Sequence, residues 1–311
     1  MSAPAPARPT STARAPRVGV VLLHHRTGLG IAETLESVER QSWSPERLLL
    51  VDNASRDGSL ERIRERWPAL EIVERERNAG YAAGMNAGIA RLGDVEAVLL
   101  LTQDCVLAPE VLELLCARLA AAPEVGMLGP LLALRSRPGR VFSAGGRLRG
   151  RRCITFHQDV PSRVADWEGR GAVEAAWLDG ACLLVRRATL DAVGPLDEGY
   201  FLYLEETELA LRARRAGWRV ECVPGAHAWQ EPGPRPHALW TRNRVRFLWR
   251  NAPRETAFLE AAVALRQAAR RWRREDPHDR EVAREKLRGL WAVLRRADPS
   301  RLYRLGGDAG K

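Results

Sequence analysis

Three acidic residues lie within four positions in the second half of the chain: Glu205, Glu206 and Glu208. They follow the aromatic run at residues 200–203 and precede a stretch rich in arginine. Carboxylates favour the first turn of a helix, and Glu208 lies one turn before Arg212, so a helix start explains part of this pattern. Three carboxylates are more than a helix start requires, and positioned carboxyl groups can also accept a proton during a reaction. Both interpretations stay open from these residues alone.

Further polar side chains follow short apolar runs that are typical of buried strands. They are His24 and His25 after residues 18–23, Asp52 and Asn53 after residues 48–51, and Asp104 after residues 97–101. Ligands of open parallel sheets bind beyond the carboxyl ends of the strands. Several polar groups that converge on this edge favour a binding site over ordinary loop polarity.

The apolar runs alternate with segments of helical periodicity, which indicates a Rossmann-like, doubly wound and mostly parallel α/β sheet. The predicted strands are residues 18–23, 48–51, 72–73, 97–101, 125–132, 181–185 and 219–223. The predicted helices cover residues 31–41, 57–67, 109–121 and 239–250, with one ending near residue 92 and one starting at residue 205. Residues 135–174 lack such patterns, and we expect a loop there that faces a substrate or moves as a flap.

A glycine-rich stretch at residues 78–88 carries Gly80, Gly84 and Gly88 at every fourth position. On a helix this spacing makes one small face, which suits either close packing or contact with a ligand. The stretch matches neither the dinucleotide-binding fingerprint nor a Walker A loop, because its glycines do not follow a strand directly and no Gly-Lys-Ser/Thr is present. This argues against a dinucleotide-dependent dehydrogenase.

The 311-residue chain is basic, with a net charge of +10. Residues 254–311 contribute to this with 15 Lys and Arg against 9 Asp and Glu. We expect a disordered tail at residues 1–17, one domain at 18–253, and an Arg-rich helical extension at 254–311 that Asp276-Pro277 interrupts. The extension either packs on the domain as a solvated helical pair or lies on an anionic membrane.

Charge and hydropathy also indicate which partners to expect for this chain and where in the cell to expect it. Arg-rich proteins can bind nucleic acid, but no recognition motif is present and few aromatic residues accompany the basic ones. We therefore expect no nucleic-acid partner. No apolar run reaches the length of a bilayer span, and the N-terminus lacks the apolar core of a signal peptide. These features predict a cytoplasmic protein, with peripheral contact at the inner face of the membrane as a further option.

Taken in order, the motifs of this chain resemble the family 2 inverting glycosyltransferases of GT-A fold, in particular their rhamnosyltransferase-like branch. The resemblance covers about residues 18–253 and rests on order and spacing, since each motif alone is weak. The motifs are residues 51–59 (VDNASRDGS), 78–88 (NAGYAAGMNAG), 101–104 (LTQD), 179–187 (DGACLLVRR), 193–198 (VGPLDE), 200–209 (YFLYLEETEL), 217–218 (GW) and Arg242-Asn243.

The resemblance implies transfer of a sugar from a nucleotide-diphosphate sugar to a hydroxyl of a cell-surface glycan or a lipid-linked acceptor. Glu206, with Glu205 beside it, would supply the general base for a single displacement with inversion. Asp52 would face the nucleotide base. The full set expected to bind the nucleotide-sugar is His25, Asp52, Asn53, Ser55, Asn78, Gly80, Gly84, Asn86, Asp104, Asp179 and Arg242.

The resemblance also implies a divalent cation, Mg²⁺ or Mn²⁺, near Asp104. Three positions depart from the family pattern. Thr102 replaces the Asn or Asp that is the first member of the metal motif, and Glu206 takes the place of an aspartate. Gln230 occupies the position of a frequent histidine, so we expect His227 as the nearest alternative metal ligand.

Two other functions stay open from the sequence. Because all three departures touch the chemistry, the chain could be a catalytically weakened relative that binds nucleotide-sugar or serves as a scaffold. A nucleotidyltransferase would share a similar sheet, but it would need a glycine-rich basic loop directly after the first strand. Residues 24–28 (HHRTG) match that loop poorly.

Overall fold

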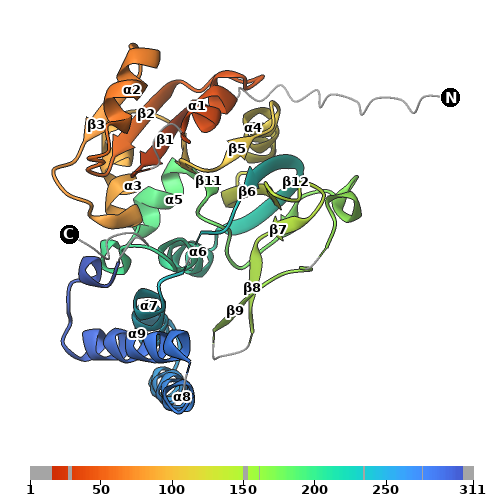
Figure 1. Cartoon of the computed structure of the whole chain (residues 1–311). Helices are drawn as coiled ribbons and strands as arrows, with labels where there is room; N and C mark the ends of the chain where they lie inside the picture. The colour runs from red at the N-terminus through yellow and green to blue at the C-terminus, as the bar shows by residue number, and fades with distance from the viewer. Residues whose placement is uncertain are drawn as a thin grey trace.

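The computed structural model describes residues 16–26, 30–149, 153–160, 162–233, 235–274 and 276–303. The predicted N-terminal tail lies outside the described residues apart from its last two positions. A twisted sheet occupies the centre of the molecule, helices cover its two faces, and a group of C-terminal helices forms a further layer on one side (Figure 1). The predicted fold class, a mostly parallel α/β sheet with C-terminal helices, is confirmed.

Over the described residues the sheet has ten strands, eight of them in the order β10-β12-β6-β11-β4-β1-β2-β3. Strand β5 (Val106–Leu107) pairs with β12 and β7 (Val141–Ser143) with β6, and β10 covers Val173–Glu174. Strand β1 pairs in parallel with β2 and β4, whereas β11 lies antiparallel between β4 and β6. The strands that position the site are β1 (Val18–His24), β2 (Arg47–Asp52), β3 (Glu71–Glu74), β4 (Ala97–Thr102), β6 (Val125–Leu134), β11 (Cys182–Arg186) and β12 (Arg219–Gln230).

Side chains alternate across each strand, so a fully apolar strand contributes to a core on both faces of the sheet. On β1, Val20 and Leu22 pack with the core on one face, and Val21 and Leu23 pack with the core on the other. The first core includes side chains from α1 (Ala32–Glu39), α2 (Ser59–Arg66) and α4 (Val111–Ala121). The second includes side chains from α3 (Gly80–Arg91), α5 (Arg187–Val193) and α6 (Glu205–Arg215).

The prediction of a loop over residues 135–174 was wrong. This segment contains β7 (Val141–Ser143), β8 (Gly146–Arg149), β9 (Ile154–His157) and β10 (Val173–Glu174), with a short 3₁₀ turn at Val164–Trp167. These strands are too short to show a period in the sequence. Two of them pair with longer neighbours, β7 with β6 and β10 with β12, whereas β8 and β9 pair with each other. Strand β5 (Val106–Leu107) is of the same kind.

Strand β12 also runs further than predicted. It continues through Pro224 and Gly225 to Gln230, and its pairing with β6 shifts register between Val223 and His227. A proline is tolerated at such an irregularity because no ladder hydrogen bond is needed there. The Gly/Pro-rich composition therefore marks a bend within a strand.

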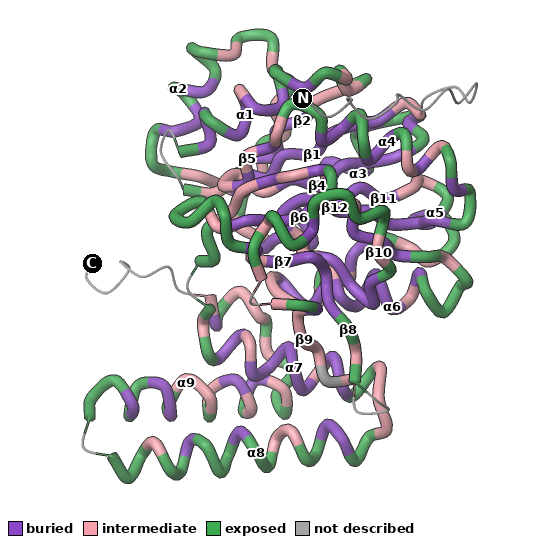
Figure 2. The backbone as a smooth tube through the Cα atoms, turned by 90° about the vertical axis from the view of Figure 1, so that its right-hand side faces the viewer, coloured by how far each residue is buried: buried purple, intermediate pink, exposed green. Residues whose placement is uncertain are grey.

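Three helices follow the sheet: α7 (His237–Asn251), α8 (Arg254–Trp272) and α9 (Pro277–Leu294), then a 3₁₀ turn, η3 (Pro299–Leu302). Helix α9 approaches α7 closely at Gly289, where a Cβ would lie 2.3 Å from the carbonyl oxygen of Ala238. Helix α8 lies on the outside of this layer (Figure 2). Within the described ranges, no helix is long and apolar enough to cross a membrane.

Candidate active site

The loop before α6 holds the acidic pair in place by an unusual backbone. Phe201, Tyr203 and Leu204 have φ angles of 69°, 75° and 75°, which residues other than glycine rarely adopt. Such a conformation persists only where surrounding contacts fix it. Glu205 and Glu206 follow this loop directly as the first two residues of α6.

Two residues of α7 supply these contacts. The amide Nδ2 of Asn243 donates to the carbonyl oxygens of Tyr200, Leu202 and Tyr203 at 2.9, 2.8 and 3.0 Å. Arg242 donates through Nη1 to the carbonyl oxygen of Gly199 at 2.6 Å. Both side chains are buried, Asn243 completely. Arg242 and Asn243 of α7 thus hold the loop in place through hydrogen bonds to its carbonyl oxygens.

The glycine-rich helix α3 holds the same loop from the other side. The N–H of Tyr81 donates to the carbonyl oxygen of Phe201 at 2.6 Å. A Cβ on Gly80 would lie 2.3 Å from that oxygen, and its φ of +87° also disfavours a side chain. A Cβ on Gly84 would meet Leu23 of β1 at 2.3 Å. The glycine period therefore serves close packing between α3, β1 and the loop.

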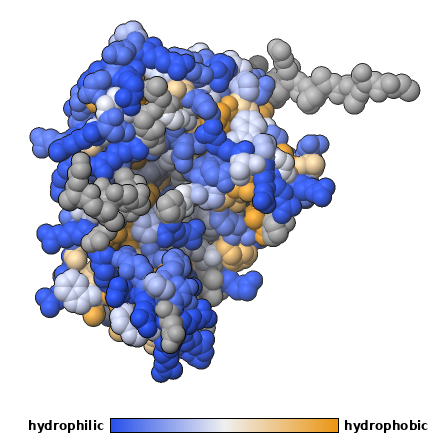
Figure 3. All heavy atoms as spheres, in the orientation of Figure 1, coloured by the Kyte–Doolittle hydropathy of each residue, from blue (hydrophilic) through white to orange (hydrophobic). Residues whose placement is uncertain are grey.

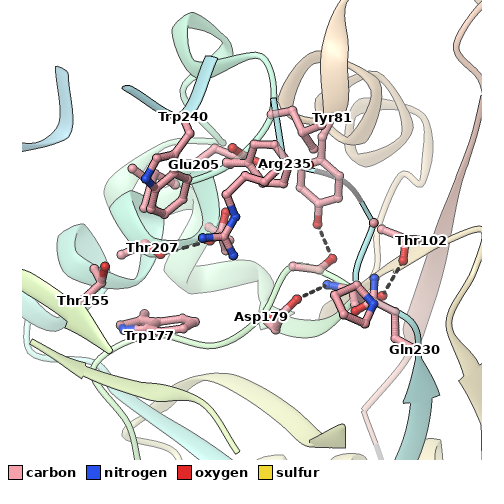
Figure 4. Close-up of a pocket in the computed structure, with 18 of the residues that line it drawn as sticks. Tyr81, Thr102, Thr155, Trp177, Asp179, Glu205, Thr207, Gln230, Arg235 and Trp240 are labelled. Carbon is pink, nitrogen blue, oxygen red and sulfur yellow. Dashed lines mark hydrogen bonds between the residues drawn. The ribbon is translucent and has the colours of Figure 1, made fainter. Parts of the chain in front are cut away.

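A cavity of about 300 Å³ opens in front of the acidic pair. Three carboxylates line it, from Asp179, Glu205 and Glu206, and Arg235 points into the same space (Figure 4). Trp177 and Trp240 lie on one side, and Thr102, Asp179 and Gln230 lie on the other (Figure 4). The lining comes from the ends of β4 and β12, from β7 and β9, from the turn before β11, from the starts of α3 and α6, and from helix α7.

The environment raises the proton affinity of all three carboxyl groups. Burial, reinforced by the charge of Asp179, raises the pKa of Glu206 to about 7. Burial and the charge of Glu206 raise the pKa of Glu205 well above its ordinary value. Burial also raises the pKa of Asp179 to about 6, and the charge of Asp104 adds to this effect. A carboxylate with a pKa near neutrality is suited to accept a proton at physiological pH.

Hydrogen bonds distinguish the two members of the acidic pair. The hydroxyl of Thr207 donates to Oε1 of Glu206 at 3.0 Å. Oε2 of Glu205 is buried and has no hydrogen-bond partner in the part of the chain that the structure describes. Glu208 instead pairs with Arg212 at 2.8 Å, as a structural ion pair within α6. Glu206 is thus the oriented carboxylate at the cavity.

A second cavity, of about 310 Å³, lies beyond the carboxyl ends of β1, β2 and β3. Its lining residues are His25, Arg26, Ala54, Arg56, Glu76, Arg77, Asn78, Phe201, Ser300 and Tyr303. Asp52 lies at the end of β2, with 3% of its surface exposed, and its carboxylate accepts a hydrogen bond from the N–H of Ser55 at 3.1 Å. Phe201 belongs to the same loop that carries the acidic pair, so one loop contacts both cavities.

A family model described as "Glycosyltransferase like family 2" matches residues 16–252 of the chain. The chain belongs to glycosyltransferase family 2. It is accordingly an enzyme that transfers a sugar from a nucleotide sugar.

Two similar proteins are named as rhamnosyltransferases, which agrees with the branch that the sequence motifs resemble. An N-acetylglucosaminyl-diphospho-decaprenol L-rhamnosyltransferase of Mycobacterium tuberculosis is 27% identical over 294 residues, which cover 81% of this chain and 95% of the relative. The rhamnosyltransferase WbbL of Escherichia coli is 42% identical over 52 residues, which cover 17% of this chain and 20% of that protein.

Solved structures show the same fold at low sequence identity. A mannosyltransferase from Pyrobaculum calidifontis, in complex with GDP-Man and Mn²⁺, superposes with a TM-score of 0.54 at 18% identity, covering 90% of this chain and 88% of that one. GalNAc-T7 with UDP, GalNAc and Mn²⁺ gives a TM-score of 0.58 at 13% identity, covering 90% of this chain and 56% of that one.

The structure of this glycosyltransferase separates the predicted donor-binding residues into two groups. His25 and Asn78 line the second cavity, with Asp52 and Ser55 beside it, and Asp179 lines the first. Four of the others line neither cavity and instead make structural contacts: Asn53, Gly84, Asn86 and Arg242. Nδ2 of Asn53 donates to Oδ1 of Asn78 at 2.9 Å, and Nδ2 of Asn86 donates to the carbonyl oxygen of Leu196 at 2.9 Å. Gly84 packs against Leu23, and Arg242 donates to the loop before α6.

The two predicted metal ligands differ in position. Asp104 lies just after β4, close enough to Asp179 to raise the pKa of that carboxyl group. His227 lies on β12, three residues before Gln230 in a regular stretch of pairing, so the two side chains leave opposite faces of the strand. Gln230 lines the cavity and His227 does not. Gln230 and His227 therefore face opposite sides of β12, and of the two it is Gln230 that faces the cavity.

Several lining residues were missed by sequence reasoning, above all Arg235, Trp177, Trp240 and Tyr81. Tyr81 lies within the glycine-rich motif, and its hydroxyl donates to the carbonyl of Gly180 at 2.6 Å. Trp177 opens the stretch that leads to the acidic pair. Arg235 follows β12 in a Gly/Pro-rich segment that shows no pattern, so only the three-dimensional arrangement reveals it.

Proposed function

We propose that this glycosyltransferase transfers L-rhamnose, with inversion, from a nucleoside-diphosphate donor to a hydroxyl group of a lipid-linked or cell-surface glycan. The mycobacterial L-rhamnosyltransferase is 27% identical to this chain, and the match covers 95% of that relative's length, which supports the proposed sugar and type of acceptor. The observation that carries the chemistry is the placement of Glu206, with its raised pKa, in a cavity between carboxylates and aromatic rings.

In the proposed reaction Glu206 accepts the proton of the acceptor hydroxyl. The acceptor oxygen forms a bond to the anomeric carbon while the bond from that carbon to the donor's diphosphate breaks on the opposite face. The nucleoside diphosphate leaves with the bonding electrons. No covalent intermediate on the protein is needed, which agrees with a single oriented carboxylate rather than a nucleophile with its own base.

The aromatic side of the first cavity supports an acceptor made of a sugar and an anionic group. Trp177 and Trp240 offer flat apolar surfaces to a sugar ring. The guanidinium of Arg235 lies 4.3 Å from the ring centroid of Trp240. An Arg in this position suits the phosphate of a lipid-linked acceptor, because guanidinium groups bind phosphate oxygens with two parallel hydrogen bonds.

For the divalent cation we propose Asp104, with the amide oxygen of Gln230, as the protein ligands. Over the described residues, no three His, Cys, Asp or Glu side chains gather as a metal site. Mg²⁺ is often held by one or two carboxylates together with substrate phosphates, so such a cluster is not required. Oε1 of Gln230 is buried and has no hydrogen-bond partner among those residues, and hard cations accept such a ligand. When bound, the cation would offset the charge of the leaving diphosphate.

The donor is tested with purified full-length protein, Mn²⁺ or Mg²⁺, and an N-acetylglucosaminyl-diphospho-polyprenol acceptor. We expect transfer from dTDP-L-rhamnose to exceed transfer from GDP-mannose and UDP-N-acetylglucosamine at least about tenfold, since a site built for one sugar leaves polar groups unpaired with another. Radiolabel incorporated into the lipid fraction measures transfer. Equal or higher transfer from another donor would refute rhamnose, and donor binding without transfer from any donor would favour a catalytically weakened relative.

An exposed apolar stripe on α8 supports the proposed contact with a membrane. Phe258, Leu265 and Trp272 recur every seven residues on one side of the helix and are 64%, 50% and 48% exposed. Arg266 and Arg270 are also exposed on this helix. Such a combination favours an anionic membrane surface, where a lipid-linked acceptor would be found. The face of the molecule that Figure 3 shows is mainly hydrophilic, with smaller apolar areas (Figure 3).

We expect the full-length protein to float with vesicles of phosphatidylcholine and phosphatidylglycerol (3:1) and not with phosphatidylcholine alone. Replacing Phe258, Leu265 and Trp272 together by Ser should abolish flotation, because the buried apolar area supplies the binding free energy. The control is Leu114→Ser on α4, which is 36% exposed on another part of the molecule. Undiminished flotation of the triple variant would rule out this face.

A further inference from the structure

The second cavity contains two residues from beyond the segment that matches the glycosyltransferase family. The match ends at residue 252, whereas Ser300 and Tyr303 line the cavity together with the ends of β1, β2 and β3. The part of the chain that follows α9 therefore runs back to the carboxyl ends of these strands and lines the cavity there.

This return is anchored by ordinary packing and capping. The Asp298 side chain accepts a hydrogen bond from the N–H of Ser300 at 2.9 Å and so caps η3. Leu302 is 6% exposed and belongs to a buried cluster with Phe201, Leu239 and Ala292. Tyr303 is thereby held at a fixed position, with its ring centroid 5.3 Å from that of Phe201.

The remaining lining of this cavity has the chemistry of a nucleotide site. Arg26, Arg56 and Arg77 line it with one acidic residue, Glu76, which favours an anionic ligand. Nδ1 of His25 is buried and has no hydrogen-bond partner within the described part of the chain. Phe201 and Tyr303 add aromatic surface next to these polar groups. A nucleoside diphosphate combines a flat ring with two phosphates and matches both features.

We propose that residues 298–303 complete the donor site, and that the ring of Tyr303 forms a wall against which the nucleoside of the donor binds. This inference rests on the proposed use of a nucleoside-diphosphate sugar. It gives the C-terminal extension a part in donor binding, in addition to its packing on α7. It also links the donor to the acidic pair, because Phe201, which touches Tyr303, lies four residues before Glu205.

The experiment measures binding of dTDP, UDP and GDP to the full-length protein by isothermal titration calorimetry in the presence of Mn²⁺. Tyr303→Leu keeps apolar contact with Phe201 and removes the ring, and we expect its Kd for the preferred nucleotide to rise about tenfold or more, in line with base–aromatic stacking. Tyr303→Phe keeps the ring and should bind within about threefold of the parent protein. Trp291→Ala, which is 55% exposed on α9, is the control for a lost aromatic residue and should bind like the parent.

The outcomes separate this inference from the proposed function. If the parent protein binds a nucleoside diphosphate and Tyr303→Leu binds it equally well, the role of Tyr303 is refuted while the donor proposal stands. If the parent protein binds none of the three nucleotides, both are refuted. The melting temperature of each variant without nucleotide shows whether it is folded. If Tyr303→Leu is destabilised, the Kd of a Ser300→Ala variant decides instead, because Ser300 also lines the cavity, and a Kd equal to that of the parent contradicts the proposal.

Discussion

Glu206→Gln is expected to lower the rate of sugar transfer about 10³-fold, because the amide cannot accept the proton of the acceptor hydroxyl. Gln has nearly the same shape as Glu, so the cavity and the hydrogen bond from Thr207 should be retained. The effect should therefore appear in kcat, with little change in the KM for the donor. Initial rates with saturating donor and acceptor measure it.

The pH dependence gives an independent check on this assignment. Burial raises the pKa of Glu206 to about 7, so the rate of the parent enzyme should rise as the pH increases through about 7 and then level off. The same raised pKa lowers the stability of the folded protein as the pH rises, although it raises the rate. Between the ordinary carboxyl pKa and about 7, the folded state binds more protons than the unfolded state, so the ionised carboxylate lowers the free energy of unfolding as the pH rises. Glu206→Gln should consequently be more stable than the parent at pH 8 and lose this advantage as the pH falls to 4, below the ordinary carboxyl pKa.

A matched control lies two residues further along the same helix. Glu208→Gln removes the same charge, but Glu208 pairs with Arg212 and does not line the cavity. We expect it to lower stability and to keep kcat within about fivefold of the parent, since it does not meet the acceptor. If Glu206→Gln transfers sugar as fast as the parent, the base is another residue. A loss seen only for Glu205→Gln would move the role to its neighbour.

The sheet could be predicted from the sequence because each buried strand is a nearly continuous apolar run. The polar residues at the ends of these runs, such as Asp52 and Asp104, follow from the same pattern, since parallel strands end at one edge. The acidic pair could be found through its position at a helix start. These features are all local: each depends on neighbours within one turn or one strand.

Features that depend on contacts between distant segments could not be predicted in this way. Arg235 and Trp240 meet Trp177 in one cavity although about 60 residues separate them in the chain. The short strands β8 and β9 pair with each other where no alternation is long enough to see. Asn86 and Arg242 belong to recognisable motifs and looked like ligand-binding residues, but their partners are backbone carbonyls of other segments. A motif identifies which residues matter without saying which contact each makes.

Asn243 is a motif residue of this kind, and its removal is expected to have a large effect on both stability and activity. Its Nδ2 contacts three carbonyl oxygens of the loop before the acidic pair, and the side chain is fully buried. In Asn243→Ala these carbonyls lose their donor, and the left-handed residues Phe201, Tyr203 and Leu204 lose the contact that fixes them. We expect the free energy of unfolding to fall by about 2–3 kcal/mol, measured by urea denaturation.

Activity should fall by more than stability alone explains, because Glu205 and Glu206 follow this loop and a small displacement of a base reduces the rate strongly. At a temperature where Asn243→Ala is still folded, we expect kcat to be lower than that of the parent about 10²-fold. Asn251→Ala is the matched control on the same helix. Its Nδ2 donates to the carbonyl of Phe247 at 3.0 Å and its Oδ1 accepts from the exposed side chain of Arg215 at 2.9 Å, so it should cost less than about 1 kcal/mol and leave kcat unchanged. A folded Asn243→Ala protein with normal kcat would show that the loop holds the acidic pair without this residue, and that α3, through Gly80 and Tyr81, is sufficient to position it.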